Sequence, residues 1–262
     1  MNYYENHEFI SASLLKVFID SPQKAHHYIN EGQKQSEALT LGRCFHEMME
    51  KKQSFQIFDE SQRPEPLKTF ASKANKEWKA SQLNQDCDVI TLAQYTELKN
   101  MVDKVHGSEF YKGLTGTKLE GIEKEFYYTF PNGNKAKCKP DALYNGKDGS
   151  IICVDWKTTA DKLTGSTRKT NYLVSKFKYD IQAVHYSEIL KNVLEKDIHF
   201  FFVFVEKSAP HDVLPVYINP NGEYYNFAFE TWNDGLTDIN ESFKTNNWKT
   251  LEQSIENKYI SL

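Results

Sequence analysis

The sequence predicts an α/β fold in which helices flank a central mixed β-sheet. Three observations support this: apolar residues at helical spacing in the N-terminal part, short strand segments separated by turn residues in the middle, and the apolar run "FFFVFV" near position 200. Of the 262 residues, 39% are hydrophobic, enough for one sizeable core. Because no repeat or linker divides the chain, we expect a single domain over residues 1–262, mainly helical over 1–110.

The N-terminal helices are predicted from their spacing and end residues. Residues 11–29 begin with a serine suited to cap a helix, and Pro22 is expected to break or restart this helix. Residues 39–52 carry apolar side chains on one side of a second helix. Residues 91–107 form a third, which we expect Gly107 to close as a C-terminal cap.

The middle of the chain changes to strand patterns. Three successive strands are expected over residues 121–130, 135–144 and 151–159, joined by the tight turns "PNGN" and "NGKDGS". The remaining expected elements are a helix over 179–195, a buried strand over 197–207, a strand over 212–219 and a C-terminal helix over 224–243.

Composition excludes several classes of protein. No apolar run is long enough to span a bilayer, and the N-terminus lacks the pattern of a secretory signal, so we expect a cytoplasmic protein. The four cysteines contain no C-x-x-C pair, which argues against a zinc or iron–sulfur site and fits free thiols. These cysteines are Cys44, Cys87, Cys138 and Cys153.

The formal net charge of −4 gives no overall basic field that would indicate a nucleic-acid partner. Residues 157–178 differ, because they hold six Lys or Arg and a single Asp. On charge alone this segment would be a solvated loop. Its position directly after an Asp–Lys pair makes it a candidate for phosphate binding.

That pair, in "VDWKTTA", is the main chemical signal of the sequence. Asp155 and Lys157 lie two positions apart on one predicted strand, so their side chains share a face. Asp141 follows Pro140 on the preceding strand, and the hairpin can bring it beside Asp155. Two close carboxylates repel each other unless a cation lies between them, and hard oxygen ligands suit Mg²⁺ or Mn²⁺. Taken alone, a D-x-K sequence is more often an ordinary ion pair.

The wider pattern resembles a known superfamily. "KCKPDALYNGKDGSIICVDWKTTAD" is similar to the core of the PD-(D/E)XK nucleases. Gly42-x-x-x-His46 and Gln182-x-x-x-Tyr186, each on a predicted helix, are similar to motifs of its RecB-like branch. The segments "ISASLLKVFIDSPQKAHHYI" and "VDWKTTAD" resemble those of the RecE type, exodeoxyribonuclease VIII and its phage relatives. The resemblance runs from about residue 9 to 206 and implies a restriction-endonuclease-like fold with its catalytic core over 119–206.

The resemblance also implies roles for individual residues. Asp141 and Asp155 would hold one or two Mg²⁺ (or Mn²⁺) ions, with the main-chain carbonyl of Trp156 as a further ligand. His46 would lie at the metal or phosphate, although a lone half-buried histidine is more often structural. Lys157 would orient the attacking water or stabilise charge on the scissile phosphate.

The sequence leaves the roles of several further residues undecided. Gln182 and Tyr186 would contact DNA or brace the lysine strand, but could also be surface residues. An acidic residue is expected on the strand before Pro-Asp, where Glu123 and Glu125 share strand parity and the sequence does not choose between them. Glu47 is expected at the surface. The candidates for DNA contact in the basic segment are Arg168, Lys169, Tyr172, Lys176 and Lys178.

Together these features predict a Mg²⁺-dependent exodeoxyribonuclease that degrades linear double-stranded DNA from its ends, 5′ to 3′ by resemblance. The resemblance further implies phage origin, a role in recombination, a single-strand annealing protein as partner and a ring-shaped homo-oligomer. The alternatives are a Cas4-like or RecB-like nuclease of other polarity, a catalytically inactive DNA-binding module of the same fold, and a restriction endonuclease. The sequence does not distinguish a trimer from a tetramer, or one metal ion from two.

Overall fold

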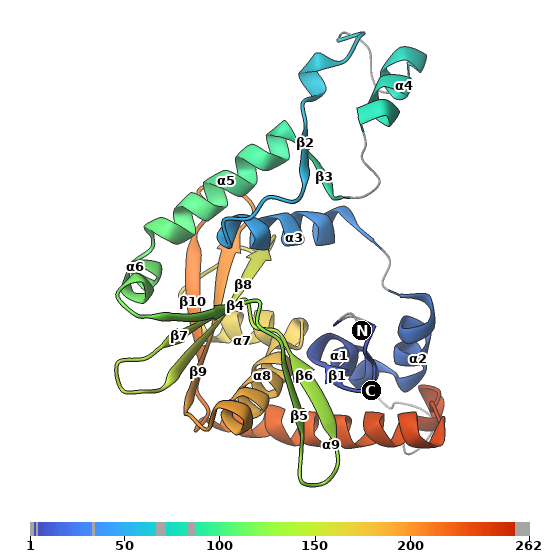
Figure 1. Ribbon diagram of the computed structural model, residues 1–262, viewed down its shortest axis with the longest axis vertical. Helices are drawn as coiled ribbons and strands as arrows, with labels where there is room; N and C mark the ends of the chain where they lie inside the picture. The colour runs from blue at the N-terminus through green and yellow to red at the C-terminus, as the bar shows by residue number, and fades with distance from the viewer. Residues whose placement is uncertain (1–2, 4, 33–34, 67–71, 83–86, 255–262) are drawn as a thin grey trace.

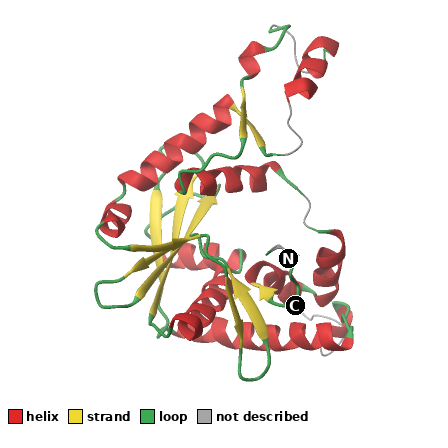
Figure 2. Ribbon diagram, in the orientation of Figure 1, coloured by secondary structure: helices red, strands yellow, loops and turns green. Residues whose placement is uncertain are grey.

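The computed structural model describes residues 3, 5–32, 35–66, 72–82 and 87–254, and confirms the α/β class. Its centre is a five-stranded mixed sheet in the order β10-β9-β8-β7-β4 (Figures 1 and 2). The central strands β8 and β9 are parallel, and all other neighbouring strands of this sheet are antiparallel. Its strands are β4 (Leu119–Ile122), β7 (Ala142–Asn145), β8 (Ile151–Thr159), β9 (Ile198–Glu206) and β10 (Val213–Ile218).

Helices cover both faces of this sheet (Figure 1). On one face lie α3 (Glu37–Met49) and α5 (Leu92–Gly107). On the other face α8 (Tyr179–Leu194) packs on the strands, and α1 (Ala12–Asp20) and α9 (Glu223–Thr245) lie against α8. The remaining helices are α2 (Pro22–Glu31), α4 (Lys73–Gln82), α6 (Glu109–Thr115), α7 (Thr167–Lys176) and the short 3-10 turns at Glu60–Gln62 and Glu252–Ser254.

The alternation of side chains along the central strands divides the core in two. In β8, Cys153 belongs to the cluster under α8, whereas Val154 and Trp156 belong to the cluster under α3 and α5. Asp155 and Lys157 have the parity of Cys153 and therefore leave the sheet on the α8 side. The predicted buried strand is confirmed, since Phe200, Phe202 and Phe204 of β9 are at most 1% exposed.

The predicted helices at the N-terminus are present with one change. Ser11 accepts a hydrogen bond from the Leu14 amide at the start of α1, and Pro22 begins α2 as predicted. The expected glycine cap at Gly107 is wrong, because Gly107 is the last helical residue. Ser108, with φ −70°, instead ends α5 and caps the start of α6.

Two predicted strands are wrong in extent, because each is divided. The segment 121–130 becomes β4 and β5 (Phe126–Thr129), and the segment 135–144 becomes β6 (Lys135–Cys138) and β7. Glu123, with φ +50°, interrupts the first segment, and Pro140 has no amide hydrogen with which to continue the second ladder. β6 pairs with β5 on one side and with β1 (Ile10–Ser11) on the other, which makes a separate three-stranded sheet, β1-β6-β5.

The pair β2 (Gln56–Phe58) and β3 (Val89–Thr91) projects with α4 away from the main sheet (Figure 1). Phe58 and Trp78 contact each other there, with ring centroids 5.0 Å apart. Among the described residues, no helix is both long and apolar enough to cross a membrane. The four cysteines are free thiols, as expected, and three of them are buried.

Candidate active site

The break between β6 and β7 positions Asp141 beside the central strand β8. One carboxylate oxygen, Oδ2, accepts a hydrogen bond of 2.7 Å from the Trp156 amide, and the side chain is buried. The Glu123 amide, at the break between β4 and β5, donates to the Asp141 carbonyl oxygen at 3.3 Å. The two strand breaks therefore bring these two carboxylates to one place.

The imidazole of His46 approaches the same place from α3. Its Nδ1 lies 3.2 Å from Asp141 Oδ1. Ligand atoms of His46, Glu123 and Asp141 all lie within 4.8 Å of one another. Two carboxylates and one imidazole form a donor set that fits a divalent cation such as Mg²⁺ or Mn²⁺. We call these three residues the acidic cluster.

Each carboxylate of the acidic cluster is paired with a cationic side chain. Asp141 pairs with His46, and Glu123 pairs with Lys139. Burial alone would lower the pKa of His46, but the charge and the hydrogen bond of Asp141 together raise it above its ordinary value. Burial alone would raise the pKa of Asp141, but the His46 charge and hydrogen bond lower it. Asp141 is therefore ionised at neutral pH and available as a ligand.

Asp155 and Lys157 lie next to the acidic cluster, on the strand neighbouring Asp141. The Lys157 ammonium contacts Asp155 Oδ1, and Gln182 Nε2 donates to Oδ2 of the same carboxylate at 2.5 Å. Burial and the Asp141 charge raise the pKa of Asp155, while Lys157 acts against this rise. Burial alone would lower the pKa of Lys157, but the Asp155 and Asp141 charges raise it, so the lysine stays protonated.

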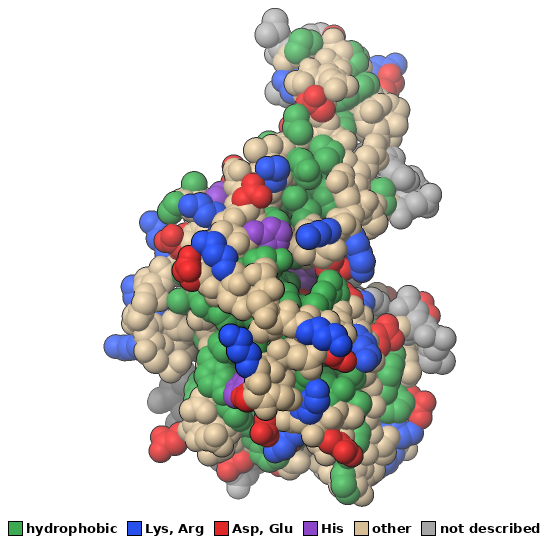
Figure 3. Space-filling view, turned by 60° about the vertical axis from the view of Figure 1, so that its left-hand side comes forward, with side chains coloured by type: hydrophobic (Ala, Val, Ile, Leu, Met, Phe, Trp, Pro, Cys, Tyr) green, Lys and Arg blue, Asp and Glu red, His purple; other side chains and the backbone are tan. Residues whose placement is uncertain are grey.

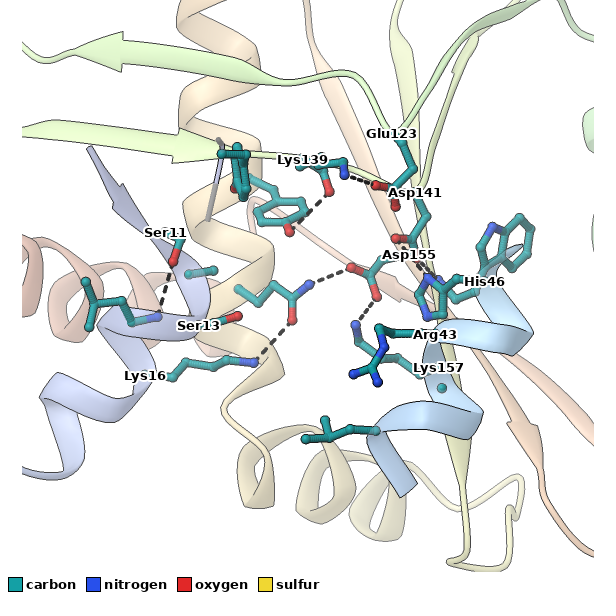
Figure 4. Close-up of a pocket in the computed structure, with 18 of the residues that line it drawn as sticks. Ser11, Ser13, Lys16, Arg43, His46, Glu123, Lys139, Asp141, Asp155 and Lys157 are labelled. Atoms are coloured by element: carbon teal, nitrogen blue, oxygen red, sulfur yellow. Dashed lines mark hydrogen bonds and ion pairs between the residues drawn. The ribbon is translucent and has the colours of Figure 1, made fainter. Parts of the chain in front are cut away.

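These residues line one cavity of about 800 Å³ (Figure 4). Its walls come from α1, α3, α8, β6 and the end of β8, so segments far apart in the sequence meet there. Besides Lys157, five cationic side chains line it: Lys16, Arg43, Lys52, Lys137 and Lys139. A cavity with acidic residues at one point and cations around it can bind a divalent metal together with a phosphate group.

The structure places Glu123, and not Glu125, in the cluster. The predicted shared parity is wrong, because Glu123 lies in the strand break while Glu125 precedes β5. The exposed Glu125 carboxylate instead accepts a hydrogen bond from the Tyr127 hydroxyl at 2.8 Å. Glu47, expected at the surface, lines the cavity and accepts hydrogen bonds from the Ser54 amide and hydroxyl.

The expected metal ligands are brought together only in part. Asp141 and His46 meet as expected, but Asp155 lies outside the acidic cluster because Lys157 and Gln182 hold its carboxylate. Trp156 lines the cavity, and its amide supports Asp141. Its carbonyl remains a predicted ligand.

The two residues of the Gln182-x-x-x-Tyr186 motif both face the cavity. Gln182 is 6% exposed and holds Asp155, which is the bracing role expected as one of two options. The Tyr186 hydroxyl donates to the Lys139 carbonyl at 3.4 Å, on the strand leading to Asp141. Neither is a surface residue, so that alternative is wrong.

None of the five predicted DNA-binding residues lines this cavity. Arg168, Lys169 and Tyr172 are exposed on α7. Lys176 pairs with Asp161 at 3.0 Å, and Lys178 pairs with Asp20. On the face shown in Figure 3, Lys and Arg side chains are interspersed with Asp and Glu. DNA contact by this segment stays a prediction.

Apart from Lys157, the cations that line the cavity were missed in the sequence. Lys137 and Lys139 are two positions apart directly before Pro140-Asp141. Because alternate residues of a strand share a face, this spacing could have predicted that both lysines lie on the side of the site. Lys16 gave no such signal, because a lysine on an amphipathic helix is ordinarily solvated.

The profile of the family described as "PDDEXK-like domain of unknown function (DUF3799)" matches residues 11–256. The chain belongs to this family. The match includes all residues of the acidic cluster together with Asp155 and Lys157. It confirms the resemblance to the PD-(D/E)XK superfamily and the restriction-endonuclease-like fold class. A PDDEXK-like domain with a metal-competent acidic cluster supports metal-dependent nuclease activity.

Two solved structures align with this PDDEXK-like domain over most of its length. The crystal structure of a "Putative exonuclease" from Eubacterium rectale aligns with a TM-score of 0.64 and 17% identity, over 95% of this chain and 88% of that chain. The crystal structure of SSO0001 aligns with a TM-score of 0.32 and 14% identity, over 76% of this chain and 84% of that chain. At these identities the first shows a shared fold alone, and the second is too distant to show one. No curated protein matches the sequence.

Proposed function

We propose that this PDDEXK-like domain is a metal-dependent exodeoxyribonuclease that hydrolyses phosphodiester bonds of linear double-stranded DNA. The observation that carries this proposal is the acidic cluster, which lies in one cavity with Lys157. A divalent cation and a positive side chain at the phosphate both stabilise the negative charge that develops during phosphodiester hydrolysis. The cavity supplies residues for both.

His46, Glu123 and Asp141 would hold the metal ion, with Asp155 beside them. A divalent cation bound there supplies charge stabilisation at the phosphate and lowers the pKa of a bound water. Lys157, fixed by Asp155, presents its ammonium to the cavity, where it would neutralise phosphate charge or orient the attacking water. The oxygen of water forms a bond to phosphorus while the bond to the leaving oxygen breaks.

The choice of substrate rests on resemblance and on charge. Positive side chains of the cavity such as Lys157 would engage phosphates rather than base edges, so cleavage is expected to ignore sequence. The RecE-type resemblance supports attack from DNA ends with 5′ to 3′ polarity. The Eubacterium rectale structure of similar fold is described as a "Putative exonuclease". A ring-shaped homo-oligomer and an annealing partner in recombination belong to the same proposal.

End-labelled linear duplexes and covalently closed circles, incubated with the protein and Mn²⁺ or Mg²⁺, test this proposal. We expect mononucleotides from 5′-labelled linear DNA, intact circles, and no cleavage in chelator. Asp141→Asn is expected to abolish cleavage while the protein remains folded by circular dichroism. Cleavage of circles, or activity that survives in chelator, would contradict the proposal. Release from 3′ labels first would overturn only the polarity.

A further inference from the structure

A chain of hydrogen bonds connects Lys16 of α1 to the Asp155 carboxylate (Figure 4). Lys16 Nζ donates to Gln182 Oε1 at 3.3 Å, and Gln182 Nε2 donates to Asp155 Oδ2 at 2.5 Å. An ammonium can only donate, so the amide oxygen of Gln182 must face Lys16. Its NH₂ group then faces Asp155, the orientation that an ionised carboxylate requires.

Burial makes this arrangement sensitive to Lys16. Gln182 is 6% exposed, and Lys16 is the donor that the structure gives to its Oε1 atom. Without that donor the amide oxygen would be a buried acceptor without a partner, which is unfavourable. The Gln182 side chain would then turn toward water and release Asp155 Oδ2.

An ion pair does not account for the position of Lys16. In the part of the chain that the structure describes, no carboxylate forms an ion pair with it, whereas Arg43, Lys52, Lys139 and Lys157 each pair with one. Its ammonium lies 5.2 Å from the centroid of the Tyr179 ring, the same distance as that of Lys157. Burial and the Lys157 charge lower the pKa of Lys16 to about 8. A half-buried ammonium beside a second one is not a stabilising device.

We propose that Lys16 is a positioning residue, which acts through Gln182 to orient the Asp155 carboxylate and, with it, Lys157. The proposal rests on the proposed function for its effect on cleavage. It makes Lys16 important for the rate of the chemical step and not for DNA affinity. Loss of such a supporting partner typically lowers activity about 10–100-fold.

A double-mutant cycle on single-turnover cleavage tests this role. The variants are Lys16→Met, which keeps the aliphatic stem, Gln182→Leu, and both together. Lys24→Met, on the exposed face of α2 outside the cavity, is the matched control. We expect about 10–100-fold loss in each single variant, no further loss in the double variant, and a control rate near wild type. Losses that multiply in the double variant would overturn the proposal.

DNA affinity separates positioning from direct contact with the substrate. Duplex binding is measured by fluorescence anisotropy with Ca²⁺ in place of Mg²⁺. We expect Lys16→Met to bind DNA within about twofold of wild type, since its effect is on the orientation of Asp155. A tenfold loss of affinity with an unchanged saturating rate would make Lys16 a substrate contact and overturn the proposal. If Lys16→Met does not fold, Lys16→Leu, which also lacks a donor, takes its place in the cycle.

A readout without cleavage distinguishes this proposal from the proposed function. Wild type, Lys16→Met, Gln182→Leu and the double variant are unfolded in urea, and the shifts of their unfolding midpoints are compared. Because the contact is intramolecular, we expect the double variant to shift less than the sum of the single variants. Additive shifts would overturn the Lys16 proposal even if the wild type is active. Absence of wild-type cleavage, with non-additive shifts, would overturn the proposed function alone.

Discussion

At the scale of single residues, the difference between Glu123 and Glu125 defines the acidic cluster. The two carboxylates are two positions apart in sequence, yet one lies within the cluster and the other is exposed beside Tyr127. The left-handed backbone of Glu123, with φ +50°, turns its side chain toward Asp141. Burial raises the pKa of Glu123, and the Lys139 contact acts against this rise.

This contrast gives a prediction with a built-in control. Glu123→Gln removes one ligand charge, so we expect the cleavage rate to fall on the order of 100-fold and the affinity for Mn²⁺ to weaken. Glu125→Gln changes only an exposed carboxylate, and its rate should stay within about twofold of wild type. Single-turnover cleavage and calorimetric Mn²⁺ titration measure the two effects. Equal losses in both variants would show that the strand break does not select the ligand.

At the scale of elements, α8 joins the site to the core. Its Gln182 and Tyr186 face the cavity, while its His185 is fully buried against β6 and α9. Trp232 Nε1 donates to His185 Nδ1 at 3.0 Å, and His185 Nε2 contacts the Lys137 carbonyl at 3.0 Å. Since an indole can only donate, the imidazole proton is on Nε2 and the ring is neutral.

The burial of His185 predicts acid sensitivity. Desolvation lowers its pKa from 6.5 to about 4, so the unfolded chain binds the proton more tightly. Stability is therefore lost as the pH falls from 6.5 toward 4, by up to roughly 3 kcal/mol from this group. Above pH 6.5 the group is neutral in both states and contributes no pH dependence.

Urea unfolding of wild type and His185→Gln between pH 7 and pH 4 checks this. Glutamine does not titrate, so we expect the variant to be less stable than wild type at pH 7. The gap between the two should narrow as the pH falls, because only wild type loses the His185 contribution. Parallel curves over the whole range would contradict the assignment of a neutral, buried His185.

At the scale of the whole molecule, the acidic cluster exists only because separate layers meet. His46 comes from the helical layer on one side of the sheet, and Asp141 and Glu123 come from strand breaks that divide two sheets. Gln182 and Lys16 reach the same cavity from the helices on the other side. Unfolding therefore separates the ligands, and metal binding is linked to the folded state.

This linkage predicts that Mn²⁺ stabilises the protein. A ligand that binds only the folded state adds about 2.7 kcal/mol at a concentration 100 times its Kd. We expect the thermal midpoint of wild type to rise with Mn²⁺ concentration, and that of Asp141→Asn to remain unchanged. Thermal unfolding followed by circular dichroism, with chelator as the reference, measures the difference. A midpoint of wild type that does not respond to Mn²⁺ would contradict the acidic cluster as a metal site.

The sequence by itself determined the fold class, most of the helices and the pairing of Asp141 with the Asp155–Lys157 strand. These depend on local properties: helical and strand periodicity, the tight turn "NGKDGS", and the parity of residues on neighbouring strands. A short hairpin fixes the register of its strands, so the proximity of Asp141 and Asp155 could be predicted without knowledge of the rest of the chain.

Only the tertiary structure decided which residues share the cavity. Periodicity along a segment does not reveal a backbone break such as Glu123, so the strand over 121–130 was predicted to be continuous, and its two glutamates could not be told apart. Nor does it show which lysine of a distant helix turns inward, as Lys16 does, whereas Gln182 was found through its motif. These choices depend on the packing of α1, α3 and α8 around the ends of the strands. The physical reason is that burial and hydrogen-bond partners are supplied by segments more than a hundred residues apart, as in the contact between Lys16 and Gln182.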